Sequence, residues 1–234
     1  MPRGRIPGSL GSTVTSGVVV TTAGSLGGAA PERTREQFKQ AVLAGQIRRK
    51  ERQGKKHFAP VPDGELEVVE AGFKMRKAGA QSCRELLRAA RAALAEAQKT
   101  ADALAKRTTA IGIASAYRDY VQDSRAWSNT FEKHYEKPEN RTRMEAMSGG
   151  RHGDAALEWF IALMSPIKAP PGFSNHSNGL AVDFSTTDGG VHLGPNTNQR
   201  AAWRASWLHP WLVANASTYR FNALASEEWH WDWA

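Results

Sequence analysis

The sequence predicts an α+β fold in which a small antiparallel sheet packs with several helices, preceded by a flexible basic N-terminal extension. Helical and strand-like segments are segregated along the chain instead of alternating, which favours this class over an α/β fold. No internal repeat is visible, and all 8 tryptophans follow residue 110. We therefore expect the globular core to form toward the C-terminus, where most large aromatic side chains are available to fill it.

Length and composition exclude several classes of protein. The 234 residues are enough for one compact domain with a sizeable appendage, or for two small domains. No run of about 18 apolar residues occurs, so no membrane span is expected. Cys83 is the only cysteine, which excludes a disulfide-bonded scaffold. The aromatic residues need a core in which to be buried, which excludes uniform disorder.

Charge is distributed unevenly and suggests three segments. Residues 1–60 hold 11 Lys and Arg against 3 Asp and Glu, and they account for the whole formal excess of +8. We interpret residues 1–60 as a basic, largely flexible extension, residues 61–110 as a helical lead-in, and residues 111–234 as the functional core.

The N-terminal extension has two features of its own. Thr and Gly interrupt every apolar run in residues 1–30, so we do not expect a cleaved secretory signal there. Residues 32–52 carry apolar side chains at helical spacing, which predicts a helix. The basic residues around its end, such as Lys55 and Lys56, are interpreted as a solvated face. The alternative is a patch for an anionic partner or for a delivery apparatus.

The body of the chain begins with a helical pattern. Residues 64–107 are predicted to be helical throughout, as two helices separated near Gly79 and Ser82. Ser82 would be the N-cap of the second helix, with Glu85 completing a capping box. The segments after it are predicted to be a short strand over 110–116, a helix from about Asp119, an amphipathic helix over 154–164, and a helix over 197–216 interrupted near Pro210.

Two strands near the C-terminus combine an apolar face with polar side chains. The segment 180–184 alternates apolar side chains with Asp183, so Asp183 is predicted on the polar face of a strand. The segment 229–233 alternates tryptophans with His230 and Asp232 and predicts a final strand. The two strands therefore each offer a potential metal ligand opposite their apolar face.

These residues form a candidate metal site. A buried carboxylate such as Asp183 needs a cation or hydrogen-bond donors. His176 lies in the loop before this strand, and together with His230 it completes a set of two histidines and one carboxylate. Such a set suits a catalytic Zn²⁺ with an open fourth position, and Glu227 and Glu228 stand beside it as candidate bases. Taken alone, these residues are also compatible with ordinary hydrogen-bonded polar groups.

Three short motifs occur between residues 115 and 230. The pattern Ser-x-His-x-x-Gly-x-Ala-x-Asp is matched by Ser174, His176, Gly179, Ala181 and Asp183. The pattern Glu-x-Trp-His is matched by Glu227, Trp229 and His230, and Ser-x-Tyr-Arg by Ser115, Tyr117 and Arg118, with Gln122 also fitting. With these motifs the chain resembles the zinc D,D-carboxypeptidase and L,D/D,D-endopeptidase family of peptidoglycan enzymes, the vancomycin-resistance carboxypeptidase type. The resemblance covers residues 84–234.

The resemblance implies a role for each matched residue. His176, Asp183 and His230 would hold one Zn²⁺ on the small sheet. Glu227 would be the general base, and Arg118 would stabilise the oxyanion or hold a substrate carboxylate. The remaining matched residues, expected to bind substrate or to position the ligands, are Ser115, Tyr117, Gln122, Ser174 and Trp229. Residues 119–172 are expected to carry specificity.

Strand geometry and the motif select different glutamates as the general base. Strict strand alternation places Glu228 on the face of His230 and sends Glu227 to the opposite face. The motif selects Glu227 instead. Both can hold only if a turn or bulge redirects the side chain of Glu227, and we expect such an irregularity because bulges are common beside active sites.

The resemblance implies a zinc peptidase that cleaves an amide bond in peptidoglycan stem peptides, as a D-alanyl-D-alanine carboxypeptidase or a lysin-like endopeptidase. The alternative is a basic cargo or binding protein with a structural or degenerate zinc site. The full set of ligands and base argues against degeneracy. We do not expect nucleic acid as a partner. Without a secretory signal, the protein is expected to be made in the cytoplasm and to reach the wall by lysis or by a secretion or injection system.

Overall fold

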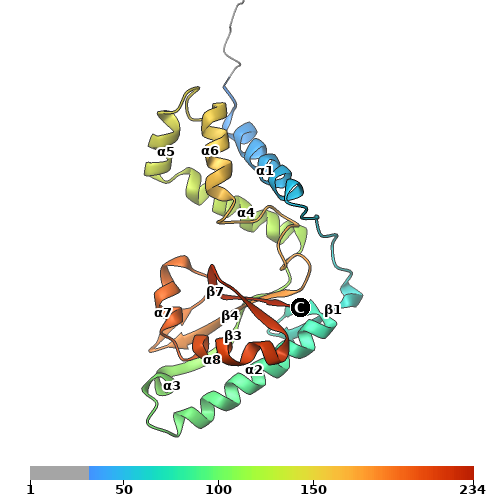
Figure 1. Cartoon of the computed structure of the whole chain (residues 1–234), viewed down its shortest axis with the longest axis vertical. Coiled ribbons are helices and arrows are strands. Elements are labelled where there is room, and N and C mark those ends of the chain that lie inside the picture. Colours follow the sequence, from blue (N-terminus) through green and yellow to red (C-terminus); the bar gives the residue numbers. More distant parts are fainter. Residues whose placement is uncertain (1–31) are drawn as a thin grey trace, which may run out of the picture. The chain divides into compact units, whose positions relative to one another are not determined.

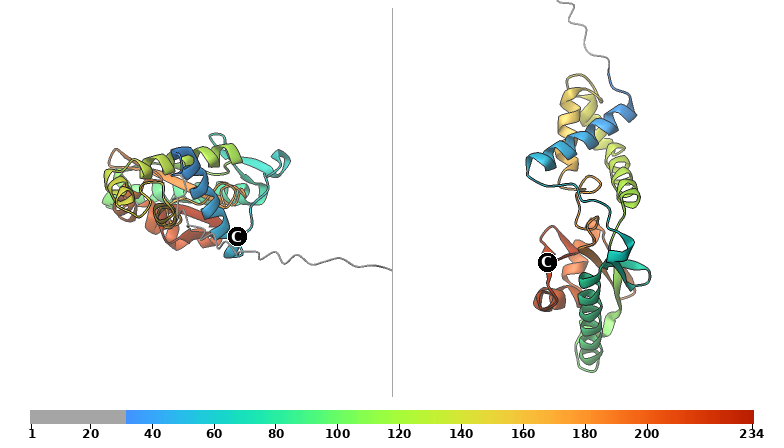
Figure 2. Two further views of the ribbon diagram at one scale, coloured as in Figure 1. Left: turned by 90° about the horizontal axis from the view of Figure 1, so that it is seen from above. Right: turned by 90° about the vertical axis from the view of Figure 1, so that its right-hand side faces the viewer.

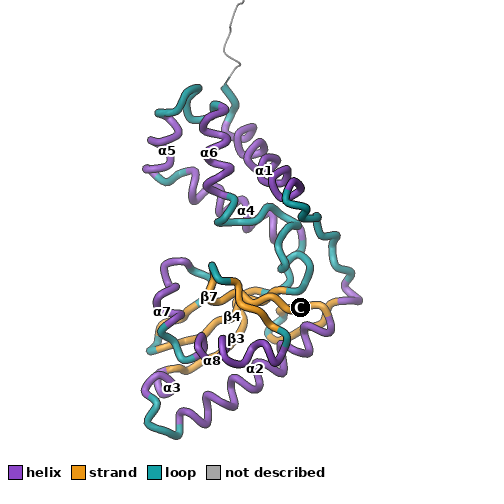
Figure 3. The backbone as a smooth tube through the Cα atoms, viewed as in Figure 1, coloured by secondary structure: helices purple, strands orange, loops and turns teal. Residues whose placement is uncertain are grey.

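The computed structural model describes residues 32–234 (Figure 1). The predictions for residues 1–30 lie outside these described residues. The α+β prediction is confirmed, and Figure 3 distinguishes the helices from the strands. The elements in chain order are α1 (Arg35–Arg52), β1 (Leu66–Glu70), β2 (Phe73–Arg76), α2 (Lys77–Gln98), α3 (Ala103–Arg107), β3 (Thr108–Ser115), α4 (Tyr120–Tyr135), α5 (Pro138–Glu145), α6 (Asp154–Met164), β4 (Ala181–Asp188), β5 (Val191–Leu193), α7 (Arg200–Arg204), α8 (Leu208–Asn215), β6 (Phe221–Leu224) and β7 (Glu227–Trp233).

The central sheet is antiparallel, and its strand order is β3-β4-β7-β6, with β5 paired to β4. The register sets one row of residues across three neighbouring strands. Ser115 in β3 pairs with Asp183 in β4, and Asp183 pairs in turn with His230 in β7. Directly paired residues have their side chains a few ångströms apart, so the register alone brings these three residues together.

A hydrophobic core lies between this sheet and helix α2, which runs along the sheet in Figure 2. Helix α2 contributes Leu86, Leu87 and Ala90, and strand β4 contributes Val182 and Phe184. Burying a large apolar side chain stabilises the fold by about 1.5–3 kcal/mol. Since successive side chains on a strand point to opposite faces, the residue between Val182 and Phe184 points away from this core.

The segment 64–107 contradicts its prediction. It begins with the hairpin β1–β2 and continues as the single helix α2, so Gly79 and Ser82 lie inside one helix instead of between two. The hairpin turn is formed by Ala71 and Gly72, both at positive φ, as in a two-residue turn. The strand pairing is irregular between Val68 and Glu70, so the buried residues of β1 are spaced three apart. The bulge therefore gives the buried residues of β1 a three-residue spacing, which is also the spacing expected of a helix.

A second hydrophobic core joins α1, α4, α5 and α6, which gather together in Figure 1. Helix α1 begins with a capping box at Thr34, which confirms the helix predicted over residues 32–52. Its Phe38 and Val42 are fully buried, and a Cβ at Gly45 would lie 2.2 Å from Ile161 Cδ1. The structure thus differs from the expectation of a largely flexible segment for the part of the extension that it describes, because α1 packs closely against α6.

Three further predictions are confirmed and one is corrected. Strand β3, helix α4 with Asp119 as its N-cap, and helix α6 lie where the sequence placed them. The helix predicted over 197–216 is interrupted at residues 205–207 and not at Pro210, which lies in the first turn of α8. Proline is tolerated there because that turn has no backbone donor to lose. Among the described residues, no helix is long and apolar enough to cross a membrane.

Candidate active site

A pocket of about 1010 Å³ opens over the sheet, and the three predicted metal ligands lie in it. His176, Asp183 and His230 are 2%, 4% and 7% exposed, and each offers one ligand atom to the same point. His176 Nε2 lies 3.2 Å from Asp183 Oδ1 and 3.1 Å from His230 Nδ1, and His230 Nδ1 lies 3.0 Å from Asp183 Oδ1. The structure therefore brings the predicted ligand set together.

The hydrogen bonds of the two imidazoles show which of their ring nitrogens carries a proton and which is free to bind a metal ion. His176 Nδ1 lies 2.7 Å from the carbonyl oxygen of Ala116, which can only accept a hydrogen bond, so Nδ1 carries the proton. His230 Nε2 lies 3.0 Å from Asp232 Oδ1 and donates to that carboxylate. Such outer contacts fix the tautomer of metal-binding histidines. With both imidazoles neutral, as metal binding requires, the atoms that converge are all lone-pair acceptors: Nε2 of His176, Nδ1 of His230 and Oδ1 of Asp183.

Three converging acceptors require a cation. Ligand atoms at about 2.0–2.1 Å from a tetrahedral metal ion are about 3.3 Å apart, close to the separations found here. The donor set of two imidazole nitrogens and one carboxylate oxygen also suits a borderline-soft divalent ion. The residues present therefore fit a single metal ion with at least one coordination position left toward the pocket.

The electrostatics of the cluster agree with this interpretation. Burial opposes ionisation of Asp183, but His176 and His230 outweigh it and hold its pKa well below the usual range. Burial likewise opposes protonation of His230, but its contacts with Asp183 and Asp232 outweigh it and raise its pKa to about 9 in the metal-free protein. The cluster thus attracts positive charge, whether a proton or a metal ion.

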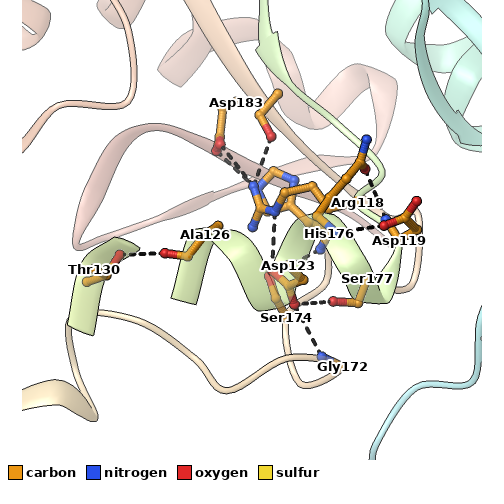
Figure 4. Close-up of polar contacts among 12 residues, drawn as sticks. Arg118, Asp119, Asp123, Ala126, Thr130, Gly172, Ser174, His176, Ser177 and Asp183 are labelled. Carbon is orange, nitrogen blue, oxygen red and sulfur yellow. Dashed lines mark hydrogen bonds and ion pairs between the residues drawn. The ribbon is translucent and has the colours of Figure 1, made fainter. Parts of the chain in front are cut away.

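Arg118 extends from the end of β3 toward the cluster (Figure 4). Its Nη1 donates to Ser115 Oγ at 2.8 Å and lies 3.8 Å from Asp183 Oδ2. Its backbone nitrogen donates to the carbonyl oxygen of His176 at 3.2 Å. The guanidinium is therefore fixed beside the ligands, where it can stabilise negative charge.

Asp123 on α4 is a buried carboxylate that the sequence reasoning missed. It is fully buried and accepts hydrogen bonds from the Gly172 nitrogen at 3.2 Å and from Ser177 Oγ at 2.7 Å (Figure 4). Arg118 Nε lies 3.3 Å from its Oδ1. Asp123 thus connects the loop that carries His176 to Arg118. Its four-residue spacing from the buried Trp127 was a signal that it lies on the buried face of the helix.

The two candidate bases are separated by the structure. Glu227 lines the pocket, and its Oε2 accepts a hydrogen bond from Trp229 Nε1 at 3.1 Å. Glu228 is held by Arg200 at 2.8 and 3.0 Å and by Arg204, and these contacts lower its pKa to about 2. The expected irregularity is present, since the register of β6 on β7 shifts just before Leu224 pairs with Glu227.

The remaining predicted residues divide into two groups. Ser174 Oγ lies 3.3 Å from the His176 nitrogen, as expected of a residue that positions the loop, and the pocket wall includes Trp229. Tyr117 and Gln122 line a neighbouring pocket that does not contain the metal cluster. Gln122 forms the capping box of α4 with Asp119, which gives it a structural role. Sequence reasoning also gave no role to Asp232, which holds His230.

Residues 32–234 therefore combine an α+β fold with a pocket that holds one cluster suited to a metal ion. A family model described as VanY, D-alanyl-D-alanine carboxypeptidase, matches residues 85–234, more than half of the chain. The protein therefore belongs to the VanY family of D-alanyl-D-alanine carboxypeptidases. The resemblance inferred from the motifs is confirmed.

Several solved structures are similar to this chain at low sequence identity. One is a mutant of the vancomycin resistance D,D-pentapeptidase VanY from the VanB-type cassette in complex with Zn(II), at 18% identity and TM-score 0.42, covering 76% of this chain and 85% of that chain. Another is VanYB in complex with D-alanine-D-alanine, at 20% identity and TM-score 0.43, covering 74% and 81%. A third is the LdcB LD-carboxypeptidase, at 18% identity and TM-score 0.43, covering 72% and 67%. No curated protein matches the chain significantly.

Proposed function

We propose that this protein is a zinc-dependent peptidase that hydrolyses an amide bond in peptidoglycan stem peptides. The observation that carries the proposal is the convergence of three lone-pair acceptors, from His176, Asp183 and His230, in a pocket that also holds Glu227 and Arg118. A hydrolase needs a polarised carbonyl, a base for water and a partner for the oxyanion. This pocket offers ligands for a metal ion that would polarise the carbonyl, Glu227 as the base and Arg118 as the partner of the oxyanion. Membership of the VanY family supports peptidoglycan as the substrate.

The side chains of the pocket suggest how the reaction proceeds. When bound, zinc lowers the pKa of a coordinated water toward about 7 and polarises the scissile carbonyl. Glu227 lies on the pocket wall, where its carboxylate can take a proton from the attacking water and pass it to the leaving amine. Arg118 presents its guanidinium beside Asp183, where it can hold the developing oxyanion or a substrate carboxylate.

The bond that is cleaved distinguishes two versions of this function. A carboxypeptidase removes the C-terminal D-alanine, whereas an endopeptidase cleaves within the peptide or its cross-link. Both use the same chemistry, and we propose the carboxypeptidase reaction first because the matching family model carries that description. Mass spectrometry of defined muropeptides after digestion would identify the product and so distinguish the two.

The test of the proposal compares the wild-type protein with two glutamate variants. We expect one zinc per chain and muropeptide cleavage that a chelator abolishes. Glu227→Gln should keep its zinc and lose about 10²–10⁴-fold in kcat, because it removes the proton acceptor. Glu228→Gln is the matched control, since its carboxylate is held by Arg200, and it should retain most of the activity. The reverse pattern would contradict the assignment of the base. Zinc retained without turnover of any muropeptide would support the alternative of a binding protein.

The route to the wall is a separate proposal. We infer release at lysis or delivery by a secretion or injection system that uses residues before Glu32. Because α1 packs in the second core, a deletion that tests this must end at residue 31 and leave α1 intact. Unchanged delivery of the shortened protein would remove the targeting role of that segment.

A further inference from the structure

The wall of the pocket that faces the metal cluster is strongly basic. Five lysines line it, and they come from the end of α1, the turn after it, the end of α4 and the segment before the His176 loop: Lys50, Lys55, Lys56, Lys133 and Lys168. None of them pairs with a carboxylate of residues 32–234. We refer to this set as the lysine wall. Its charge is therefore available to a ligand.

The acidic residues that line the pocket serve the metal site and do not neutralise the lysine wall. The carboxylates that line the pocket are those of Asp183, Glu227 and Asp232. Asp183 belongs to the metal cluster, Asp232 holds His230, and Glu227 is the candidate base. Each of them already has a task at the metal site. Like charges gathered in a pocket create a potential that concentrates oppositely charged ligands.

The lysine wall is fixed relative to the metal cluster by hydrogen bonds. Gln46 Nε2 on α1 donates to the carbonyl oxygen of Lys168 at 3.1 Å, and Arg49 Nη1 donates to Ser165 Oγ at 3.2 Å. These bonds attach the end of α1 to the segment that leads into the His176 loop. Lys168 itself is half-buried and lines the same pocket as Arg118 and Glu227. Its burial, together with the charge of Arg118, lowers its pKa.

We propose that the lysine wall is a cationic subsite that binds side-chain carboxylates of the substrate, so that the enzyme prefers stem peptides with free carboxylates over peptides with amidated ones. This inference rests on the proposed function and names the substrate class of the same pocket. A single C-terminal carboxylate would not require five cations, whereas a peptide with acidic side chains offers several partners. Lysine suits such partners because its ammonium is a compact charge on a flexible stem. Three of the lysines precede residue 85, outside the part of the chain that the family model matches.

The experiment uses two synthetic peptides that end in D-Ala-D-Ala and differ only in carrying side-chain carboxylates or carboxamides. We expect kcat/KM to favour the acidic peptide by about 10-fold at low ionic strength and by less than about 3-fold at 0.5 M salt, because salt screens exposed charges. The double variant Lys55→Gln/Lys56→Gln should bring this ratio toward one. The matched control, Lys99→Gln/Lys106→Gln, removes the same charge outside the pocket and should leave the ratio unchanged.

The outcomes separate the subsite from the catalytic function. A wild-type ratio near one, or a ratio that the Lys55/Lys56 variant leaves unchanged, would overturn the subsite while the peptidase stands. Direct binding of both peptides to the Glu227→Gln protein decides the case without turnover: tighter binding of the acidic peptide supports the subsite, and equal binding overturns it. Equal binding of the peptides combined with tight binding of a phosphate-bearing wall polymer would assign the lysine wall to that polymer instead.

Discussion

The replacement Asp123→Asn tests whether the buried carboxylate on α4 positions the catalytic residues. Asparagine keeps the shape of the side chain and one acceptor oxygen, which can still serve Gly172 and Ser177 at the position of Oδ2. Its amide nitrogen then takes the position of Oδ1 and meets Arg118 Nε as donor against donor. The variant therefore loses the contact with Arg118 selectively.

The size of the effect follows from the charge and burial of this contact. A hydrogen bond to a charged group contributes about 1.5–3 kcal/mol, and 1 kcal/mol corresponds to about 2–4 °C in Tm for a chain of this size. We expect Tm to fall by about 3–12 °C. Because Arg118 is no longer held beside Asp183, kcat/KM should fall by about 10–100-fold while zinc content stays at the wild-type value.

The assay combines thermal unfolding, zinc analysis and muropeptide kinetics on the same preparations. The matched control is Asp119→Ala, which removes the N-cap of the same helix and should cost about 1 kcal/mol of stability with little effect on kcat/KM. If Asp123→Asn stays within twofold of wild type in kcat/KM, Asp123 has no positioning role. If both variants lose activity in proportion to their Tm, the effect is one of stability alone.

Three further predictions concern the ligands, the guanidinium and pH. His176→Ala leaves two protein ligands, so zinc content and activity should both be lost; full zinc with full rate would remove His176 from the ligand set. Arg118→Lys keeps the positive charge but loses the paired N–H donors of the guanidinium, so kcat/KM should fall by about 10²-fold at unchanged zinc content. A value within twofold of wild type would show that Arg118 takes no part in the reaction. The pKa of Glu228 is lowered from 4.5 to about 2 by its hydrogen bond with Arg200, so its contribution to stability is present above pH 4.5 and is lost as the pH falls to 2. Urea unfolding of metal-free wild type and Glu228→Gln should therefore differ at pH 7 and converge at low pH, and a constant difference would contradict this assignment.

Sequence periodicity predicted those elements whose buried residues follow one regular spacing. Helix α6 is of this kind and lies where its pattern placed it. Strand β7 was predicted from the alternation of tryptophans with polar residues, although its four central residues, 228–231, are all buried. The hairpin β1–β2 was missed because the irregular pairing near Val68 spaces the buried residues of β1 as in a helix. The end of α1 was interpreted as part of a flexible extension because its charge is visible in the sequence, whereas its packing against α6 depends on Gly45.

The site residues that could be predicted from the sequence are those that belong to short motifs. The ligand set could be named in advance because His176 and Asp183 lie seven residues apart in one motif, and His230 follows Glu227 in another. Asp123 could not be identified in this way, since its partners Gly172 and Ser177 lie 49 and 54 residues away along the chain. The lysine wall combines four separate segments, and only the folded chain brings them to one pocket.

The row of paired residues across β3, β4 and β7 also bears on how the fold resists unfolding. Asp183 and His230 are 47 residues apart in sequence, and a metal ion that binds both closes the intervening chain into a loop. By the chain-entropy estimate used for disulfides, a covalent cross-link over such a loop would stabilise the fold by about 4 kcal/mol. Since Cys83 is the only cysteine, the chain has no internal disulfide to supply such a constraint. The ion would then act as a removable cross-link, and the availability of metal would set how long the protein survives proteases and heat.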